Sequence, residues 1–276
     1  MDVHDTKSDT KEPRLLVGCC AISYGKYLRS GQMTMEDFIR KGVELHLDGV
    51  DMTVYFLKST EAAYLASLRH LAFKNGISFS GAACGANLAQ ADKVKRAQVL
   101  EDIKKWIDVT DQLGTSHLRV FGGKLPSEAT TGQGVAWSVE VMKAAVDVAG
   151  KRGITLGLED HSGFTQQADT VLEIIHKVDS PFAGINLDIT HFLPTPTADG
   201  YAQIEMCIPY ATMTHIRYRF DSGDLIDLNR VWQMFAKGGY KGYMSAEYET
   251  EKEDPMTGVP RLIEDMRKLC RKYSAV

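Results

Sequence analysis

The amino-acid sequence has no apolar run long enough to cross a membrane. Its apolar stretches fall well short of the ~20 residues that a spanning helix needs. The polar start MDVHDTKSDTKEP also lacks the hydrophobic region of a signal peptide. Of the 276 residues, 44% are hydrophobic and 25% are charged, which is typical of a soluble globular protein and excludes a disordered chain. We therefore expect a cytoplasmic protein with no membrane partner.

Cysteine is scarce, and no CxxC pair occurs. An odd number of cysteines without such spacing favours neither a disulfide framework nor a zinc site made of thiolates. We expect reduced thiols at all five positions, which are Cys19, Cys20, Cys84, Cys207 and Cys270.

The sequence also lacks a block of basic residues. Its 32 Lys and Arg are outnumbered by 36 Asp and Glu, which gives a formal net charge of −4. Proteins that bind nucleic acid depend on clustered Lys and Arg to neutralise phosphates. The charge balance therefore disfavours a nucleic-acid partner and favours a small neutral or polar substrate.

Short β-branched or apolar runs alternate with amphipathic segments of helical length, which is the pattern of repeated βα units. Residues 1–14 are polar and aperiodic, so we expect a disordered tail there and a single domain over residues 15–276. Eight repeats of about 33 residues fill that domain. Its length is close to the ~250 residues typical of a (β/α)8 barrel. The predicted fold is a single α/β TIM barrel.

A doubly wound open sheet is the competing architecture. Such a sheet usually shows a GxGxxG turn after its first strand, where this sequence reads AISYGKY. The eight predicted strands cover residues 15–20, 48–52, 77–83, 117–121, 154–159, 183–188, 211–217 and 242–247. Eight helices are predicted. One begins near residue 34, one ends at the 151–153 stop signal, and a weaker one precedes the seventh strand. The other five cover residues 60–75, 91–113, 166–177, 226–237 and 258–272.

Side chains that can bind a metal stand at the carboxyl ends of four consecutive predicted strands. They are Glu159, Asp188, His215 and Glu247. In a barrel these strand ends meet at one mouth, where the active sites of this fold lie. A single acid in such a place is more often an ion-pair or capping residue. Four donors together are harder to explain by packing, because a buried carboxylate is costly unless it is paired or bound to a cation.

Three carboxylates and one imidazole suit a hard or borderline divalent ion with open positions for substrate oxygens. We expect Mn2+ at this site, with Mg2+ or Co2+ as alternatives. A structural zinc ion would favour thiolate ligands instead.

Four further polar residues near these strand ends are candidate substrate contacts. His161 and His191 follow the fifth and sixth strands, Arg217 follows the histidine of the seventh, and Arg119 lies within the fourth. Each side chain can hydrogen-bond a hydroxyl group or polarise a carbonyl. The alternatives are that the histidines fix turns and that the arginines neutralise neighbouring carboxylates.

The first two strands end in residues of a different kind. Tyr24, Tyr55 and Phe56 follow these strands, and aromatic side chains there can wall a sugar-sized pocket or seal the barrel end. Cys19 and Cys20 end the first strand, and we interpret them as barrel filling and not as nucleophiles.

The segments GITLGLEDH, GINLDITH, THIRYRF and GYKGYMSAEYE resemble, in order and spacing, the strand-five to strand-eight signatures of the sugar phosphate isomerase/epimerase superfamily. These xylose isomerase-like TIM barrels include ketose 3-epimerases, hydroxypyruvate isomerase, inosose dehydratase and endonuclease IV. The resemblance extends from Leu15 to Tyr273. It implies an enzyme that acts on a small-molecule sugar, in a superfamily where homo-oligomers are common.

The resemblance also implies roles for individual residues. The four strand-end residues correspond to the metal ligands, and His191 and Arg217 correspond to substrate contacts. In ketose 3-epimerases the two glutamates that flank the metal exchange a proton with the substrate carbon, which is the role implied for Glu159 and Glu247. The divalent cation stabilises the enediolate that this proton transfer creates.

The fate of that enediolate decides the reaction class. Return of the proton to the other face gives an epimer, return to the adjacent carbon gives an isomer, and loss of a β leaving group gives a dehydratase or a 3-keto-glycoside lyase. A ketose 3-epimerase usually carries another glutamate shortly after its strand-five ligand, where this sequence has Thr165 and Gln166. We expect an isomerase or epimerase, with a lyase as the alternative and a non-catalytic sugar-binding barrel as the third reading. A nuclease is disfavoured, because the early strands lack the histidines of the endonuclease IV branch.

Overall fold

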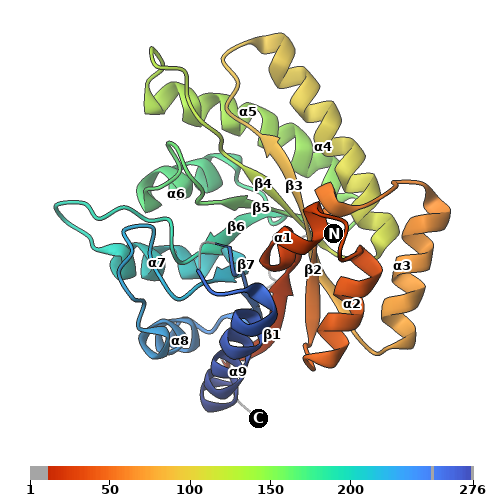
Figure 1. Ribbon diagram of the computed structural model, residues 1–276. Coiled ribbons are helices and arrows are strands. Elements are labelled where there is room, and N and C mark those ends of the chain that lie inside the picture. The colour runs from red at the N-terminus through yellow and green to blue at the C-terminus, as the bar shows by residue number, and fades with distance from the viewer. Residues whose placement is uncertain (1–11, 250–251, 275–276) are drawn as a thin grey trace.

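The computed structural model describes residues 12–249 and 252–274. Within these residues, eight parallel strands form a closed barrel in which sequential strands are neighbours and β8 returns to β1 (Figure 1). The predicted single (β/α)8 barrel is therefore confirmed. The tail predicted at residues 1–14 lies largely outside the described residues, and β1 begins at Arg14.

The strands are short, as expected for a barrel in which a helix follows each strand. Their bounds are β1 Arg14–Cys20, β2 Gly49–Thr53, β3 Ser78–Asn87, β4 His117–Phe121, β5 Thr155–Glu159, β6 Ala183–Asp188, β7 Ala211–Ile216 and β8 Lys241–Ala246.

The helices lie around the outside of the strands (Figure 1). Their bounds are α1 Gly25–Arg29, α2 Met35–Glu44, α3 Ala62–Lys74, α4 Lys93–Leu113, α5 Thr131–Gly150, α6 Ala168–Val178, α7 Gly200–Cys207, α8 Leu228–Lys237 and α9 Pro255–Tyr273. Among the described residues, three short 3-10 helices lie between strands and helices, at η1 Ala21–Tyr24, η2 Val54–Phe56 and η3 Ile208–Tyr210.

The described residues contain nine α-helices, one more than the eight predicted. The additional helix, α1, follows η1 directly, so the AISYGKY segment that we expected to be a turn is helical. A helix of 5 residues completes little more than one turn, which is too short to show a 3.6-residue apolar period. Strand β3 also runs to Asn87, beyond its predicted end at residue 83.

Local capping motifs fix the ends of several helices. The Thr34 hydroxyl accepts a hydrogen bond from the Asp37 backbone N–H, and the Asp37 carboxylate accepts one from the Thr34 N–H. This reciprocal capping box satisfies N–H groups that have no partner inside α2. At the end of α4, Gly114 adopts the left-handed conformation, with φ 79°, that closes many helices.

The apolar core lies between the strands and the helices. Leu65 and Leu68 of α3, and Ile103 and Ile107 of α4, are fully buried and recur at three- or four-residue spacing. Trp232 of α8 is fully buried as well. This spacing turns one face of each helix onto the barrel and holds the strands in place. None of the described helices combines the length and apolar character needed to span a bilayer.

Candidate metal centre

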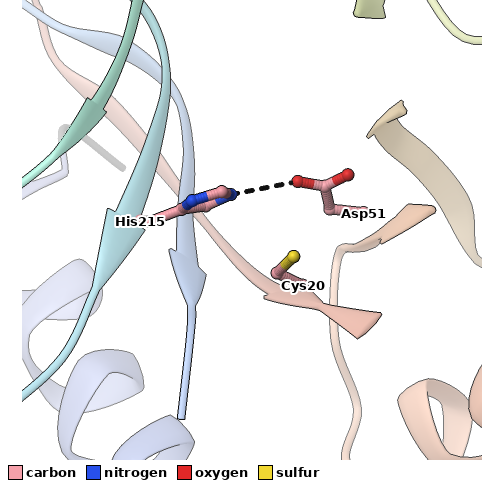
Figure 2. A group of neighbouring side chains, drawn as sticks. All are labelled: Cys20, Asp51 and His215. Atoms are coloured by element: carbon pink, nitrogen blue, oxygen red, sulfur yellow. Dashed lines mark hydrogen bonds and ion pairs between the residues drawn. The ribbon is translucent and has the colours of Figure 1, made fainter. Parts of the chain in front are cut away.

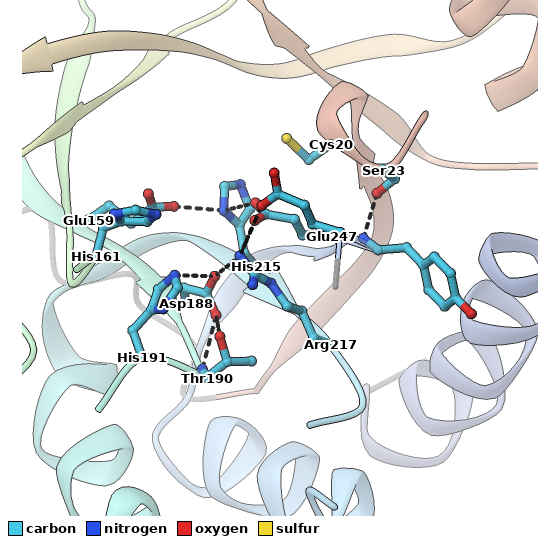
Figure 3. A network of polar contacts seen from close by, with 12 residues as sticks. Cys20, Ser23, Glu159, His161, Asp188, Thr190, His191, His215, Arg217 and Glu247 are labelled. Atoms are coloured by element: carbon cyan, nitrogen blue, oxygen red, sulfur yellow. Dashed lines mark hydrogen bonds and ion pairs between the residues drawn. The ribbon is translucent and has the colours of Figure 1, made fainter. Parts of the chain in front are cut away.

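The four strand-end residues come together at one mouth of the barrel. Glu159 and Asp188 are the last residues of β5 and β6, His215 is the next to last residue of β7, and Glu247 directly follows β8. One nitrogen or oxygen atom from each of these residues lies within 4.8 Å of all the others (Figure 3). All four residues are buried, with at most 5% of their surface exposed.

The His215 ring is the centre of this group. Its Nδ1 atom lies 2.8 Å from Oε1 of Glu159 and 2.7 Å from Oε2 of Glu247. One ring nitrogen carries either a single proton or a single lone pair, so at most it shares one proton between the two carboxylates. Lone pairs that converge in this way fit a shared divalent cation, which would be bound by all three atoms.

Asp188 completes the set on the side of β6. Its Oδ1 atom accepts hydrogen bonds from the backbone N–H of Thr190 at 2.9 Å and from the Thr190 hydroxyl at 2.6 Å. Its Oδ2 atom lies 3.1 Å from Nε2 of His191 and 3.1 Å from Nη2 of Arg217. Thr190 therefore fixes one carboxylate oxygen, while the other faces the cationic side chains.

Two buried arginines balance the carboxylate charge. Arg119 donates from Nη1 to Oε2 of Glu159 at 2.7 Å, and Arg217 donates to Oε1 of Glu247. Burial raises the pKa of each glutamate, but the neighbouring guanidinium group and the His215 ring together outweigh burial and hold the pKa of both carboxyls below its usual value. Both glutamates are therefore ionised at neutral pH, as metal ligation requires.

The histidines next to the carboxylates differ in environment. Burial disfavours a charge on His191, but Asp188 and Asp221 outweigh burial and raise the pKa of this ring to about 11. The His215 pKa is also held well above its usual value, because Glu247 and the other acids around it outweigh burial. A cation at the centre would replace the positive charge that these rings carry.

The four candidate substrate contacts lie at different positions relative to this centre. Arg119, His191 and Arg217 contact its carboxylates directly. His161 contacts none of the four ligand candidates by hydrogen bond, and its ring stacks 4.6 Å from the rings of both Phe121 and His191. Their predicted role toward a substrate stays a prediction.

Sequence reasoning missed several residues that hold the centre in place. Asn186 donates from Nδ2 to Oε1 of Glu159 at 3.0 Å, and Oδ1 of Asp160 accepts a hydrogen bond from the Asp188 backbone at 2.8 Å. Asp160 is fully buried, and burial raises the pKa of its carboxyl well above the usual value. Strand alternation could have found Asn186, because residues two apart on a strand face the same side. No sequence pattern of this kind identifies Asp160, because it directly follows Glu159 and lies beyond the end of β5.

A second group lies on the other side of the same ring. Nε2 of His215 lies 3.2 Å from Oδ2 of Asp51, with Cys20 close to both (Figure 2). The Cys20 thiol lies 3.5 Å from the Thr53 hydroxyl, and burial raises the pKa of Cys20 to about 11. Cys19 and Cys20 are both buried at the end of β1. A thiol in such an environment is unreactive at neutral pH, as the barrel-filling interpretation requires.

Tyr55 connects the centre to the surface. Its hydroxyl accepts a hydrogen bond from Nη2 of Arg119 at 2.7 Å, while the residue as a whole is 49% exposed. Tyr24, by contrast, is 1% exposed and packs against Phe38, with ring centroids 6.2 Å apart. Of the two tyrosines, only Tyr55 is open to solvent beside the mouth.

Comparison with known proteins agrees with this architecture. The model of a family described as xylose isomerase-like TIM barrel matches residues 39–272. No curated protein matches the chain by sequence.

Solved structures share the whole fold at low sequence identity. D-psicose 3-epimerase from Clostridium cellulolyticum H10, solved with D-tagatose, has a TM-score of 0.75 and 16% identity, covering 94% of this chain and 99% of its own. The IolI protein with a bound zinc atom has a TM-score of 0.74 and 15% identity, covering 95% of this chain and 100% of its own. The probable 3-DHS dehydratase AsbF from Bacillus anthracis has a TM-score of 0.67 and 14% identity, covering 93% and 98%. At this identity the likeness concerns the fold, because one barrel fold hosts many reactions.

Proposed function

The chain belongs to the xylose isomerase-like TIM barrel family, and from that premise we propose that it is a divalent-metal-dependent isomerase or epimerase of a keto sugar or related polyol. The observation that carries the proposal is the convergence of four buried donor side chains at the carboxyl ends of four neighbouring strands. Ketose epimerases with the same fold support the choice of reaction class.

Glu159, Asp188, His215 and Glu247 would hold the ion. Three carboxylates and one imidazole favour Mn2+, with Mg2+ or Co2+ as alternatives. When bound, a divalent cation supplies Lewis-acid stabilisation of the negative charge that develops on substrate oxygens.

The two glutamates are the proposed catalytic residues. An ionised carboxylate can accept the proton on the carbon next to the substrate carbonyl, which leaves an enediolate and a neutral carboxylic acid. If that acid returns the proton to the adjacent carbon, the product is an isomer. If the second carboxylate first takes up a proton from water and donates it from the opposite face, the product is an epimer, and the first carboxylic acid then releases its proton to water.

Neighbouring side chains hold the glutamates in position for these proton transfers. Arg119 and Asn186 each hydrogen-bond one oxygen of Glu159, at 2.7 and 3.0 Å. Arg217 donates to Glu247, and the Ser23 hydroxyl bonds the backbone of the two residues that flank Glu247, Ala246 and Tyr248. The proposed contacts for substrate hydroxyl and carbonyl groups are His161, His191 and Arg217, which lie beside the carboxylates (Figure 3), and Arg119, which donates to Glu159.

A lyase of the same fold is the second candidate. An enediolate with a leaving group on the β carbon expels that group, so the same residues would catalyse dehydration or cleavage of a 3-keto-glycoside. The fold shared with a probable dehydratase favours this alternative. So does Thr165, which is buried and hydrogen-bonds the His161 carbonyl, in a segment where ketose 3-epimerases usually carry a further glutamate. A sugar-binding barrel without catalysis is the third candidate.

Deuterium exchange tests the proposal directly. EDTA-treated protein is incubated in D2O, with and without Mn2+, with ketoses, ketose phosphates, inososes and 3-keto-glycosides, and the products are analysed by mass spectrometry. Deuterium uptake that depends on Mn2+, without fragmentation, supports an isomerase or epimerase. Uptake together with water loss or cleavage supports the lyase. No exchange on any substrate, in a protein that binds Mn2+ stoichiometrically, contradicts the proposed roles of Glu159 and Glu247.

Variants sharpen this test. We expect Glu159→Gln and Glu247→Gln each to abolish exchange, because glutamine cannot accept the proton. Glu264→Gln is the matched control, since Glu264 lies on α9 in an exposed ion pair with Arg267. Equal exchange by all three variants would contradict the assignment.

We also propose a cytoplasmic location, a small-molecule partner and a homo-oligomeric state for the protein. Five free, buried cysteines are compatible with the reducing cytoplasm. The net charge of −4 supports a small-molecule sugar as the partner in place of nucleic acid. Homo-oligomers are expected from the family, and sedimentation of the purified protein would measure the oligomeric state.

A further inference from the structure

Asp51 reaches the proposed metal centre from the far side of the barrel. It lies on β2, where it pairs in register with Cys20 of β1 and Gly81 of β3. His215 lies on β7, separated from β2 by β8 and β1 in the closed sheet. The Asp51 carboxylate nevertheless lies 3.2 Å from Nε2 of His215, and the two side chains are at most 1% exposed (Figure 2).

This contact determines how the imidazole ring can be used. A neutral histidine has one N–H donor and one nitrogen lone pair, and the hydrogen bond made by one nitrogen sets the state of the other. A carboxylate only accepts hydrogen bonds, so Asp51 requires the proton to lie on Nε2. The lone pair is then on Nδ1, which is the nitrogen that faces Glu159 and Glu247.

We propose that Asp51 is a positioning residue that keeps the proton of His215 on Nε2 and thereby presents Nδ1 to the divalent cation. The inference rests on the proposed function, because it requires the ion at the four-residue centre. Carboxylates that bind the second nitrogen of a metal-bound histidine fix both its tautomer and its orientation, and they typically change metal affinity by about 10–100-fold.

The same three side chains could instead bind a second ion. Cys20, Asp51 and His215 each place one donor atom within 4.8 Å of the others. A second ion there would need Nε2 as a ligand, and His215 would then have to lose both ring protons to bind two ions. It would also need a thiolate, although Cys20 is buried beside the neutral Thr53 hydroxyl. The hydrogen bond from Nε2 to Asp51 needs neither change, so the geometry favours positioning over ligation.

Metal affinity is the first test. Isothermal titration of EDTA-treated protein with Mn2+ should give one ion per chain for the wild type. Asp51→Asn should bind Mn2+ about 10–100-fold more weakly. Its amide can donate to Nε2, and that would move the proton to Nδ1. Cys20→Ser is the matched control, because it changes the same cluster without removing the acceptor for Nε2–H, and its affinity should stay within about twofold of the wild type.

NMR of 15N-histidine-labelled, Zn2+-loaded wild-type protein tests the proton position without any variant. We expect His215 to show a protonated Nε2 and a metal-bound Nδ1. A metal-bound Nε2 would overturn the proposal. Circular dichroism of each metal-free variant shows whether it is folded, and if Asp51→Asn fails to fold, the wild-type spectrum alone decides.

The outcomes separate this inference from the function on which it rests. A wild type that does not bind Mn2+ contradicts the proposed function and this role together. If the wild type and Asp51→Asn each bind one Mn2+ ion with the same affinity, the positioning role of Asp51 is overturned and the proposed function is not. If the wild type binds two ions per chain and Asp51→Asn and Cys20→Ser each bind only one, the cluster of Cys20, Asp51 and His215 is a second metal site. That result would overturn the positioning role.

Discussion

Nδ1 of His215 in β7 lies 2.7 Å from Oε2 of Glu247, which directly follows β8, and neither residue is more than 5% exposed. The same nitrogen lies 2.8 Å from Glu159, so three potential ligands share one small volume. Carboxylates brought this close repel one another unless a positive charge lies between them. In the metal-free chain that charge comes from the histidine and arginine side chains, and a bound cation would take it over.

Binding of a divalent cation at the proposed centre should therefore raise the stability of the protein. A ligand that binds only the folded state stabilises it by about 4 kcal/mol at a concentration 1,000-fold above its Kd. We expect Mn2+ to raise the melting temperature of EDTA-treated protein, as followed by circular dichroism. Glu247→Gln should lose most of this increase, because a neutral amide is a poor ligand for a hard cation.

Glu173→Gln is the control for this experiment, since Glu173 forms an exposed ion pair with Lys177 on α6. Its melting temperature should rise with Mn2+ as in the wild type. An equal rise in all three proteins would place the ion elsewhere.

Replacing Arg119 by Met should destabilise the metal-free protein. Arg119 is buried and bonds Glu159 at 2.7 Å, and loss of one partner from a buried ion pair leaves an uncompensated charge that costs about 3–5 kcal/mol. We expect urea unfolding to show a loss of that size without metal and a smaller loss with Mn2+, because the cation would compensate Glu159.

Tyr55→Phe separates charge from hydrogen bonding at the same arginine. It removes the hydroxyl that accepts from Nη2 of Arg119 and leaves the pair with Glu159 intact. Its cost should be about 1 kcal/mol and insensitive to Mn2+. If Arg119→Met lost equal stability with and without Mn2+, Arg119 would not be balancing a metal ligand.

The sequence predicted those parts of the fold that depend on long, periodic patterns. Strands β4 and β6 have the predicted bounds, as parts of a βα repeat that recurs about every 33 residues along the chain. The helix α1 was missed because five residues are too few to reveal a period. The strand-end acids were identifiable because a barrel brings all strand ends to one mouth.

The supporting residues could not be predicted in the same way. Asp51 approaches His215 from a position 164 residues away in sequence, and only the closed barrel shows that their side chains meet. Asp160 directly follows Glu159, but its link to the Asp188 backbone depends on how β5 and β6 pack. Local sequence patterns carry no information about such contacts.

The burial of His117 predicts a pH dependence of the stability of the protein. Burial lowers the pKa of this ring to about 4, below its ordinary value of 6.5. As the pH falls, the unfolded chain takes up the proton first, so stability is fully present above about pH 6.5 and is lost as the pH falls toward about 4. The total loss from this residue is roughly 3 kcal/mol.

Comparison with His117→Asn isolates this contribution, because other acids also titrate in this range. Urea unfolding of both metal-free proteins is measured from neutral pH down to about pH 4. The stability of the wild type relative to the variant should fall by roughly 3 kcal/mol over that range. A constant difference between the two proteins would mean that His117 is protonated in the folded state.

Ser23 holds the backbone on both sides of Glu247. Its hydroxyl donates to the carbonyl of Ala246 at 3.0 Å and accepts from the N–H of Tyr248 at 2.9 Å (Figure 3). Ser23→Ala removes both hydrogen bonds, so we expect a stability loss of about 1–3 kcal/mol and Mn2+ binding about tenfold weaker, because Glu247 is no longer fixed. Ser30→Ala is the control, since Ser30 is exposed and its hydroxyl donates to the Tyr27 carbonyl on the surface. Titration with Mn2+ and urea unfolding measure the two effects separately. A Ser23→Ala variant that loses stability but binds Mn2+ like the wild type would show that the Ala246–Tyr248 backbone supports the fold without positioning Glu247.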